Sequence, residues 1–250
     1  MKSSNSNRVN RRKISQIPRT SVSEIEELIS ELEIFCRSIP EQNDSSQQFM
    51  KNYVIVRLTS IIEQLMKSLI SELIDELDIS PELVLDDETI SFELDVLNSL
   101  NSSEITKGKI IVAHLGNLDA GTISKILSKI NQMDIFQWMD EFYDITENES
   151  TLKSFSELNS IFMLRNDIVY NLFNTDETTK SLIAKIRTVR IWTFAIYYYT
   201  KMNVLIFDKN VSDKDIEKKF KPIFEDDNFS NFLSKFKSLV KEHRKNFSIN

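Results

Sequence analysis

Apolar residues recur at helical spacing along a long stretch of this chain, residues 49–77. The repeating positions are Val54, Leu58, Ile61, Ile62, Leu65, Leu69 and Leu73. A helix with so long an apolar stripe has to bury that stripe against other elements over its whole length, so we predict a central helix here. The whole chain contains only three glycines and four prolines, which are too few turn residues for a many-stranded sheet. The sequence therefore predicts an all-α fold.

Further segments extend this expectation to most of the chain. Residues 1–20 are basic and poor in apolar residues, which predicts a flexible arm: either a tether for RNA or an acidic partner, or a solvated tail. Residues 21–48 are interpreted as an N-terminal helix and linker, 49–205 as the main helical domain, and 206–250 as a C-terminal helical appendage.

Several segments within these regions carry separate predictions. Helices are expected over residues 90–100 and 177–205, whereas 107–115 remain ambiguous between a short helix and a strand. The apolar run 191–207 contains Lys201 and Asn203, so it is interpreted as a buried helix and not as a membrane span.

Composition excludes several classes of function. The formal net charge of -7 speaks against a protein that coats nucleic acid generally, although a local basic patch remains compatible with RNA binding. The single cysteine, Cys36, excludes an internal disulfide and, with only two histidines, a usual zinc site. No phosphate-binding glycine loop is present. We expect no metal or other cofactor, no membrane segment, and a cytoplasmic protein.

The most informative stretch for function is residues 158–173, where Arg165 interrupts an apolar helical face. The residues of this predicted core-facing stripe are Leu158, Ile161, Phe162, Ile168, Val169 and Leu172. A guanidinium keeps its charge, so a core-facing arginine needs a carboxylate, a carbonyl or a phosphate as partner. Asn166 and Tyr170 share a second face with Asn159 and Met163. An ideal helix places positions 165 and 170 about 140° apart, from which we expect that a partner chain would have to complete a shared site.

The segment Arg165-Asn166-Asp167-Ile168-Val169-Tyr170-Asn171 resembles the signature helix of the HEPN superfamily. In that family an Arg, usually followed by Asn or Asp, lies about five residues before a His. Here Tyr170 stands in the position of the His. A weaker resemblance extends to residues 56–70 and 116–127, so that it covers roughly residues 49–205.

The resemblance implies an antiparallel helical bundle with extra N- and C-terminal helices, paired as a homodimer whose two motif helices form a cleft for RNA. Active family members are metal-independent endoribonucleases, often toxins or phage-defence effectors with an antitoxin or defence partner protein. Arg165 would bind phosphate, with Asn166 beside it, Tyr170 as general acid or base, and Asp167 in support. Glu63 would be the counterion of Arg165 or would lie at the dimer seam; alternatively, it is a solvated glutamate on an outer helix face.

Tyr170 leaves the activity open. A tyrosine in its ordinary state is only ~0.1% phenolate at pH 7, so it is a poor base, but it can serve as an acid or hydrogen-bond donor. Three outcomes follow. The protein is a slow ribonuclease, or it binds RNA or a nucleotide without cleavage, or it is a structural dimer in which Arg165 forms a core ion pair. The second outcome includes a dimer that regulates a partner protein. Arg187 and Arg190 are candidates to line an RNA cleft; equally, they are interpretable as surface charge.

Overall fold

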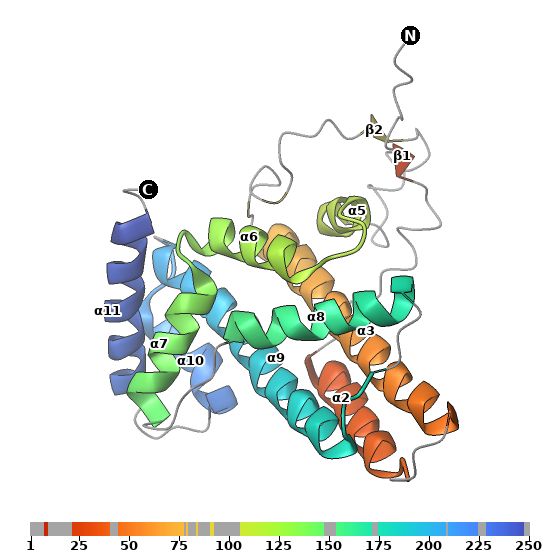
Figure 1. Ribbon diagram of the computed structural model, residues 1–250. Helices are drawn as coiled ribbons and strands as arrows, with labels where there is room; N and C mark the ends of the chain where they lie inside the picture. The colour runs from red at the N-terminus through yellow and green to blue at the C-terminus, as the bar shows by residue number, and fades with distance from the viewer. Residues whose placement is uncertain are drawn as a thin grey trace.

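The computed structural model describes residues 8–9, 22–40, 45–77, 79, 84, 91–92, 106–147, 154–171, 175–208, 210–224 and 229–247. Within these ranges the chain forms nine helices and one pair of two-residue strands, which confirms the prediction of an all-α fold (Figure 1). The strands β1 (Arg8–Val9) and β2 (Ser91–Phe92) pair in parallel. The first lies in the predicted flexible arm and the second in the predicted helix 90–100; the remainder of both segments lies outside the described residues.

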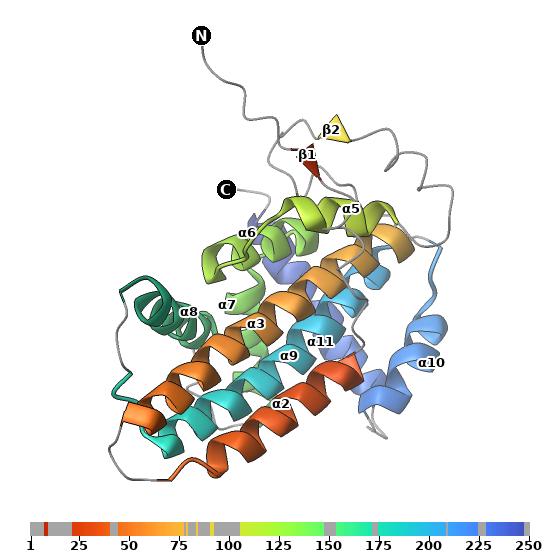
Figure 2. The same ribbon diagram turned by 90° about the vertical axis from the view of Figure 1, so that its right-hand side faces the viewer.

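Three long helices form the centre of the fold. These are α2 (Val22–Arg37), α3 (Ser45–Glu76) and α9 (Thr179–Phe207), and they pack side by side with α2 antiparallel to the other two (Figure 2). The apolar stripe of α3 is buried as predicted. The buried positions of the stripe are Val54, Leu58, Ile61, Ile62, Leu65, Leu69 and Leu73. The prediction of a central helix is therefore confirmed.

The motif helix α8 (Ser154–Asn171) crosses α3 and also packs against α6, α7 and α9. In Figure 2, α8 lies on one side of the layer formed by α3 and α9, and α2 lies on the other side. Side chains that α9 directs towards α2 are thus separated from α8 by the thickness of this layer.

The short helix α5 (Lys107–His114) packs on the C-terminal half of α3, so the ambiguous segment 107–115 is a helix. Its close approach depends on Gly108, because a Cβ atom there would lie 2.3 Å from the carbonyl oxygen of Ser71. The Gly108 amide donates to Asp75 Oδ1 at 2.7 Å. A tertiary contact therefore decides the structure of a segment whose own pattern was ambiguous.

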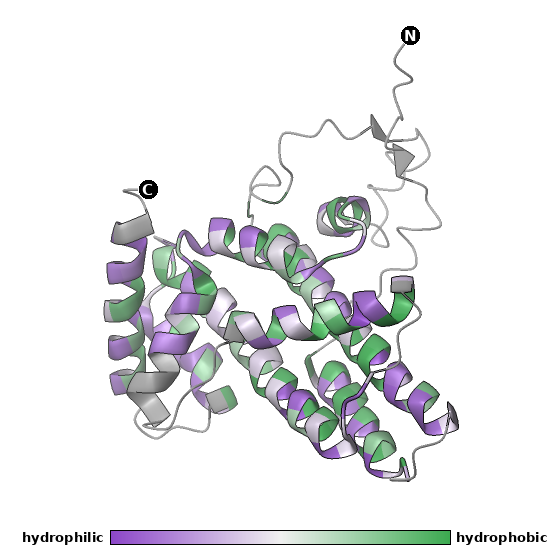
Figure 3. Cartoon of the chain, in the orientation of Figure 1, coloured by the Kyte–Doolittle hydropathy of each residue, from purple (hydrophilic) through white to green (hydrophobic). Residues whose placement is uncertain are grey.

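The remaining helices are α6 (Ala120–Asn131), α7 (Ile135–Glu147), α10 (Asp213–Phe224) and α11 (Phe229–Phe247). The α10 and α11 helices belong to the predicted C-terminal appendage, yet their apolar residues join the same core as the central helices. Figure 3 shows hydrophilic and hydrophobic residues alternating along these ribbons, as expected for amphipathic helices.

Polar residues of the run 191–207 have partners inside the protein. Asn203 Nδ2 donates to Asn131 Oδ1 at 2.6 Å, and Lys201 Nζ contacts the carboxylate of Glu72. Both interactions tie α9 to a neighbouring helix. In the part of the chain that the structure describes, no helix combines the length and hydropathy required to cross a membrane.

Candidate functional site

The N-terminal half of α8 anchors the motif in the core. Leu158, Ile161 and Phe162 are at most 3% exposed, as their helical spacing predicts. Val169, which the same pattern placed inward, is 42% exposed, so this prediction was wrong. Successive residues of a helix point about 100° apart. Near the end of α8, Ile168 is partly buried against the core, and the next residue, Val169, therefore points away from it. Leu172, the last residue of the predicted stripe, lies outside the described residues.

Arg165 is neither sealed in the core nor fully in solvent, because the residue as a whole is partly buried. Its Nη1 donates to Asn166 Oδ1 at 3.0 Å, and its Cζ lies 5.9 Å from the ring centroid of Tyr170. One chain by itself brings these three residues together. Backbone angles alone did not predict this approach, since they take no account of side-chain length. Completion of the site by a partner chain stays a prediction.

The predicted second face of α8 is a mixed polar and apolar surface. Met163 is 59% exposed and Tyr170 is 68% exposed, and Asn159 Nδ2 lies 3.6 Å from Met163 Sδ. Asn166 lies on the same face and is partly buried. The arrangement offers one cation, one amide and one phenol beside exposed apolar surface.

Glu63 lies on α3, close enough to Arg165 for the two charges to interact. Burial raises the pKa of the Glu63 carboxyl above its usual range, while the cations of Lys67 and Arg165 oppose that rise. The effect of burial on the pKa of Glu63 is therefore larger than the opposing effect of Lys67 and Arg165. Lys67 has a larger effect on the pKa of Glu63 than Arg165 has, so the role of Glu63 as counterion of Arg165 stays a prediction.

Glu63→Gln is expected to leave the protein as stable as the wild type, or slightly more stable, at about pH 7. Because the pKa of this carboxyl is higher in the folded state than in the unfolded state, its contribution to the stability of the fold is fully present below the unfolded-state pKa. That contribution is lost as the pH rises through the folded-state pKa. The ionised group therefore carries a cost at neutral pH that an amide of the same size removes. Thermal unfolding at about pH 7 and pH 4 measures this effect, and the difference from wild type should shrink at the lower pH.

The exposed residue Glu27 supplies the matched control, Glu27→Gln, for the loss of one negative charge. A clear loss of stability in Glu63→Gln alone at neutral pH would contradict the proposed balance. It would mean that attraction to Arg165 outweighs the cost of burial.

Asp167 faces a different space from Arg165. It lines an open pocket of about 490 Å³ between α8 and the start of α9, together with Leu164, Ile168, residues 175–178 and Ser181. The structure therefore does not group Asp167 with the pair formed by Arg165 and Tyr170.

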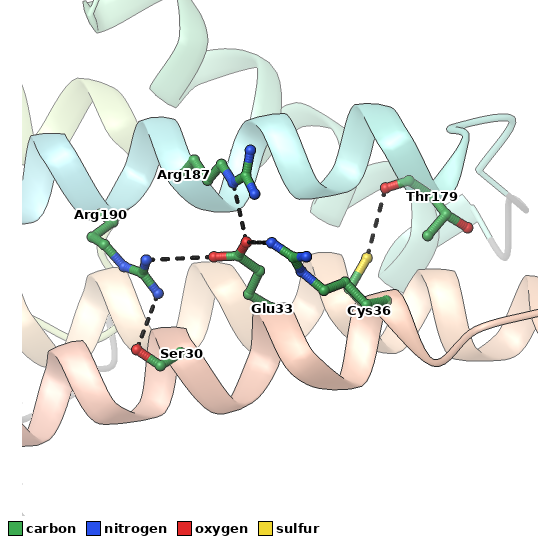
Figure 4. Close-up of polar contacts among 7 residues, drawn as sticks. Ser30, Glu33, Cys36, Thr179, Arg187 and Arg190 are labelled. Atoms are coloured by element: carbon green, nitrogen blue, oxygen red, sulfur yellow. Dashed lines mark hydrogen bonds and ion pairs between the residues drawn. The ribbon is translucent and has the colours of Figure 1, made fainter.

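Arg187 and Arg190 lie on the face of α9 that contacts α2, on the other side of the central layer from α8. Arg187 Nε donates to Glu33 Oε1 at 3.0 Å, and Arg190 Nη1 lies 3.4 Å from Glu33 Oε2 (Figure 4). Within one subunit they do not line a common cleft with Arg165. The sequence patterns did not single out Glu33, although its spacing of four from Arg37 on a predicted helix was a visible signal of an ion pair.

The two histidines of the chain lie on helices other than the motif helix. His114 is the last residue of α5, and His243 Nε2 lies 2.9 Å from Glu141 Oε2 between α11 and α7. Among the described residues no group of three or more His, Cys, Asp or Glu side chains is arranged to hold a metal ion. The polar side chains that the structure brings together at the α8 surface are those of Arg165, Asn166 and Tyr170.

Comparison with known proteins does not add an assignment to this geometry. No known protein family, curated protein or solved structure matches the chain.

Proposed function

We propose that this chain is a HEPN-like protein that acts on RNA through Arg165, Asn166 and Tyr170. One observation carries the proposal: a partly buried arginine in an apolar stripe binds an amide with its guanidinium and lies close to an exposed phenol. Only one of its donors is used by Asn166 Oδ1. A guanidinium of this kind matches a phosphate group in both charge and hydrogen-bond geometry.

The chemistry proposed is metal-independent cleavage of the RNA backbone. Such cleavage needs a base that takes the proton of the attacking 2′-hydroxyl, a cation for the charge that gathers on the phosphate, and an acid that protonates the leaving 5′-oxygen. Solvent water takes the 2′-hydroxyl proton. Arg165 supplies the cation. Tyr170, with its phenol exposed to solvent, supplies a proton or a hydrogen bond to the phosphate, and the second arginine comes from a symmetry-related copy.

Pairing of two copies through α8 is part of the same proposal. Met163, Val169 and Tyr170 expose apolar surface on this helix, and burial of such surface favours association. Two motif helices facing each other would bring two guanidiniums to one phosphate backbone. Resemblance of the motif supports a toxin or phage-defence effector with an antitoxin or defence partner as the setting.

The exposed apolar face also favours a second candidate, a dimer that has lost cleavage and regulates a partner protein. Met163 and Tyr170 are more than half exposed, which suits a protein surface as well as an RNA one. The two candidates differ in whether RNA is cut when every metal ion is removed.

Arg165→Ala is expected to weaken RNA binding about tenfold or more and to abolish cleavage, because a charge-assisted hydrogen bond is worth about 1.5–3 kcal/mol. Tyr170→Phe should retain binding and lose cleavage. The measurement uses the full chain with transfer RNA and a chelator, and follows both binding and chain cleavage. Arg57→Ala and Tyr53→Phe, on α3, are the matched controls.

Cleavage that resists the chelator and is lost in both variants supports the enzyme. Binding that is lost in Arg165→Ala without any cleavage by the wild type supports the regulatory dimer. If neither activity depends on Arg165 while Arg165→Gln lowers the melting temperature strongly, the arginine is a structural ion-pair residue and the proposal is wrong.

A further inference from the structure

Three arginines from two helices converge on a single carboxylate at the junction of α2 and α9. Glu33 Oε1 accepts from Arg37 Nη2 at 2.6 Å and from Arg187 Nε at 3.0 Å, and Glu33 Oε2 lies 3.4 Å from Arg190 Nη1. Arg190 Nη2 also donates to Ser30 Oγ at 3.0 Å. We call Arg37, Arg187 and Arg190 the arginine cluster.

The charges in this cluster do not balance. Three guanidinium charges against one carboxylate leave two positive charges in a small volume. The carboxylate is committed to them, because hydrogen bonds from Arg37 and Arg187 hold the pKa of Glu33 below its usual range despite its burial. An anion from outside the chain would relieve the mutual repulsion of the remaining positive charge.

The arginine cluster is open to such an anion. The side chains of Arg37 and Arg187 are 56% and 57% exposed, whereas Glu33 is 9% exposed. Figure 4 shows Nε of Arg187 directed at Glu33 and one of its two terminal nitrogens directed away from that carboxylate. Glu33 thus acts as a buried anchor that orients the guanidiniums while leaving outer N–H groups available.

We propose that the arginine cluster is a binding site for one phosphate group of a small phosphomonoester. A phosphomonoester carries about 1.5 to 2 negative charges at pH 7, which matches the two uncompensated positive charges. Arginine also presents paired donors that suit two oxygens of one phosphate. The cluster lies across the central layer from α8, so this site does not depend on the function proposed for Arg165.

A compact anion fits this surface better than a long nucleic acid. The same helix α2 carries Glu31 beside Glu33, and Glu24, Glu26 and Glu27 one to two turns before Glu31. A polyanion laid along α2 would meet these carboxylates and be repelled. The positive charge is therefore local, as a single phosphate group requires.

Calorimetric titration of the full chain with inorganic phosphate and with adenosine 5′-monophosphate tests the proposal, in chloride buffer at constant ionic strength. Wild type should bind both ligands and should not bind adenosine. The double variant Arg37→Ala/Arg187→Ala should bind at least about tenfold more weakly, because two of three cations are gone. Lys235→Ala/Lys241→Ala, which removes two exposed cations from α11, should bind as wild type does.

Folding and the α8 site are checked in the same series. The melting temperature of each variant excludes unfolding as the cause, and Arg187→Lys, which keeps the charge, provides a milder change at the same position. Arg165→Ala should leave phosphate binding unchanged, so failure here is distinguishable from failure of the RNA proposal. Absence of phosphate binding by wild type, or equal binding by the double variant, would overturn the proposal.

A 12-nucleotide RNA with a 5′-hydroxyl separates the two sources of phosphate. Its affinity should not change in Arg37→Ala/Arg187→Ala. If this RNA loses affinity in the double variant while phosphate and the mononucleotide do not bind, the ligand is a nucleic-acid backbone and the assignment to a small phosphomonoester is wrong.

Discussion

Trp138→Ala is expected to lower the free energy of unfolding by about 3–5 kcal/mol, the range for large-to-small changes at buried aromatic sites. Trp138 lies on α7 with 0% exposure. Its ring meets Phe236 of α11 edge-on with centroids 4.9 Å apart, and Tyr199 of α9 at 5.5 Å. One side chain therefore joins three helices, and its removal leaves a cavity that none of them alone can fill.

Urea unfolding followed by circular dichroism measures this loss. Phe49→Ala is the matched control, because Phe49 is 73% exposed and surface changes usually stay within about 0.5 kcal/mol. The variant should still unfold in one cooperative transition, because residues of α9 and α11 belong to the same hydrophobic core. A loss of less than about 1 kcal/mol would show that the C-terminal helices fold separately from the core.

Glu72→Gln is expected to cost about 3 kcal/mol or more, because it leaves a buried ammonium without its counter-charge. The side chains of Glu72 and Lys201 are 11% and 12% exposed. Tyr197 completes the group: its hydroxyl donates to Glu72 Oε2 at 2.6 Å and accepts from Lys201 Nζ at 2.7 Å. Lys201 also lies 4.4 Å from the Tyr197 ring centroid.

A double-mutant cycle with Lys201→Met separates the ion pair from its surroundings. Each single change leaves one buried charge without its partner. The double change Glu72→Gln/Lys201→Met removes both charges, so its loss of unfolding free energy should be about 2 kcal/mol smaller than the sum of the two single losses. Unfolding free energies of the four proteins measure the coupling. Strict additivity would mean that the two charges do not stabilise each other.

The same network predicts a sensitivity to alkaline pH. Burial, and then the hydrogen bond to Glu72, raise the pKa of Tyr197 above its ordinary value. An unfolded tyrosine ionises near pH 10, so the stabilisation from this group is complete below about pH 10 and is lost as the pH rises further. Tyr197→Phe should weaken the fall in melting temperature above about pH 10.

The pattern of apolar residues was sufficient to predict helices α2, α3, α8 and α9, because helical spacing and burial are local properties of the sequence. It also identified Arg165, Asn166 and Tyr170 as the unusual feature of α8. It was insufficient for segment 107–115, whose short apolar run suits a strand as well as a helix. There the contact of Gly108 with α3 decided the outcome.

The sequence by itself determined which residues are available for chemistry and which faces of the helices are apolar. Only the tertiary structure decided which charges meet. Arg165 reaches Tyr170 because a long side chain spans the angle between two helical faces. Arg187 and Arg190 meet Glu33 from more than 150 positions away, and no periodicity within one helix contains information about such a distant pair.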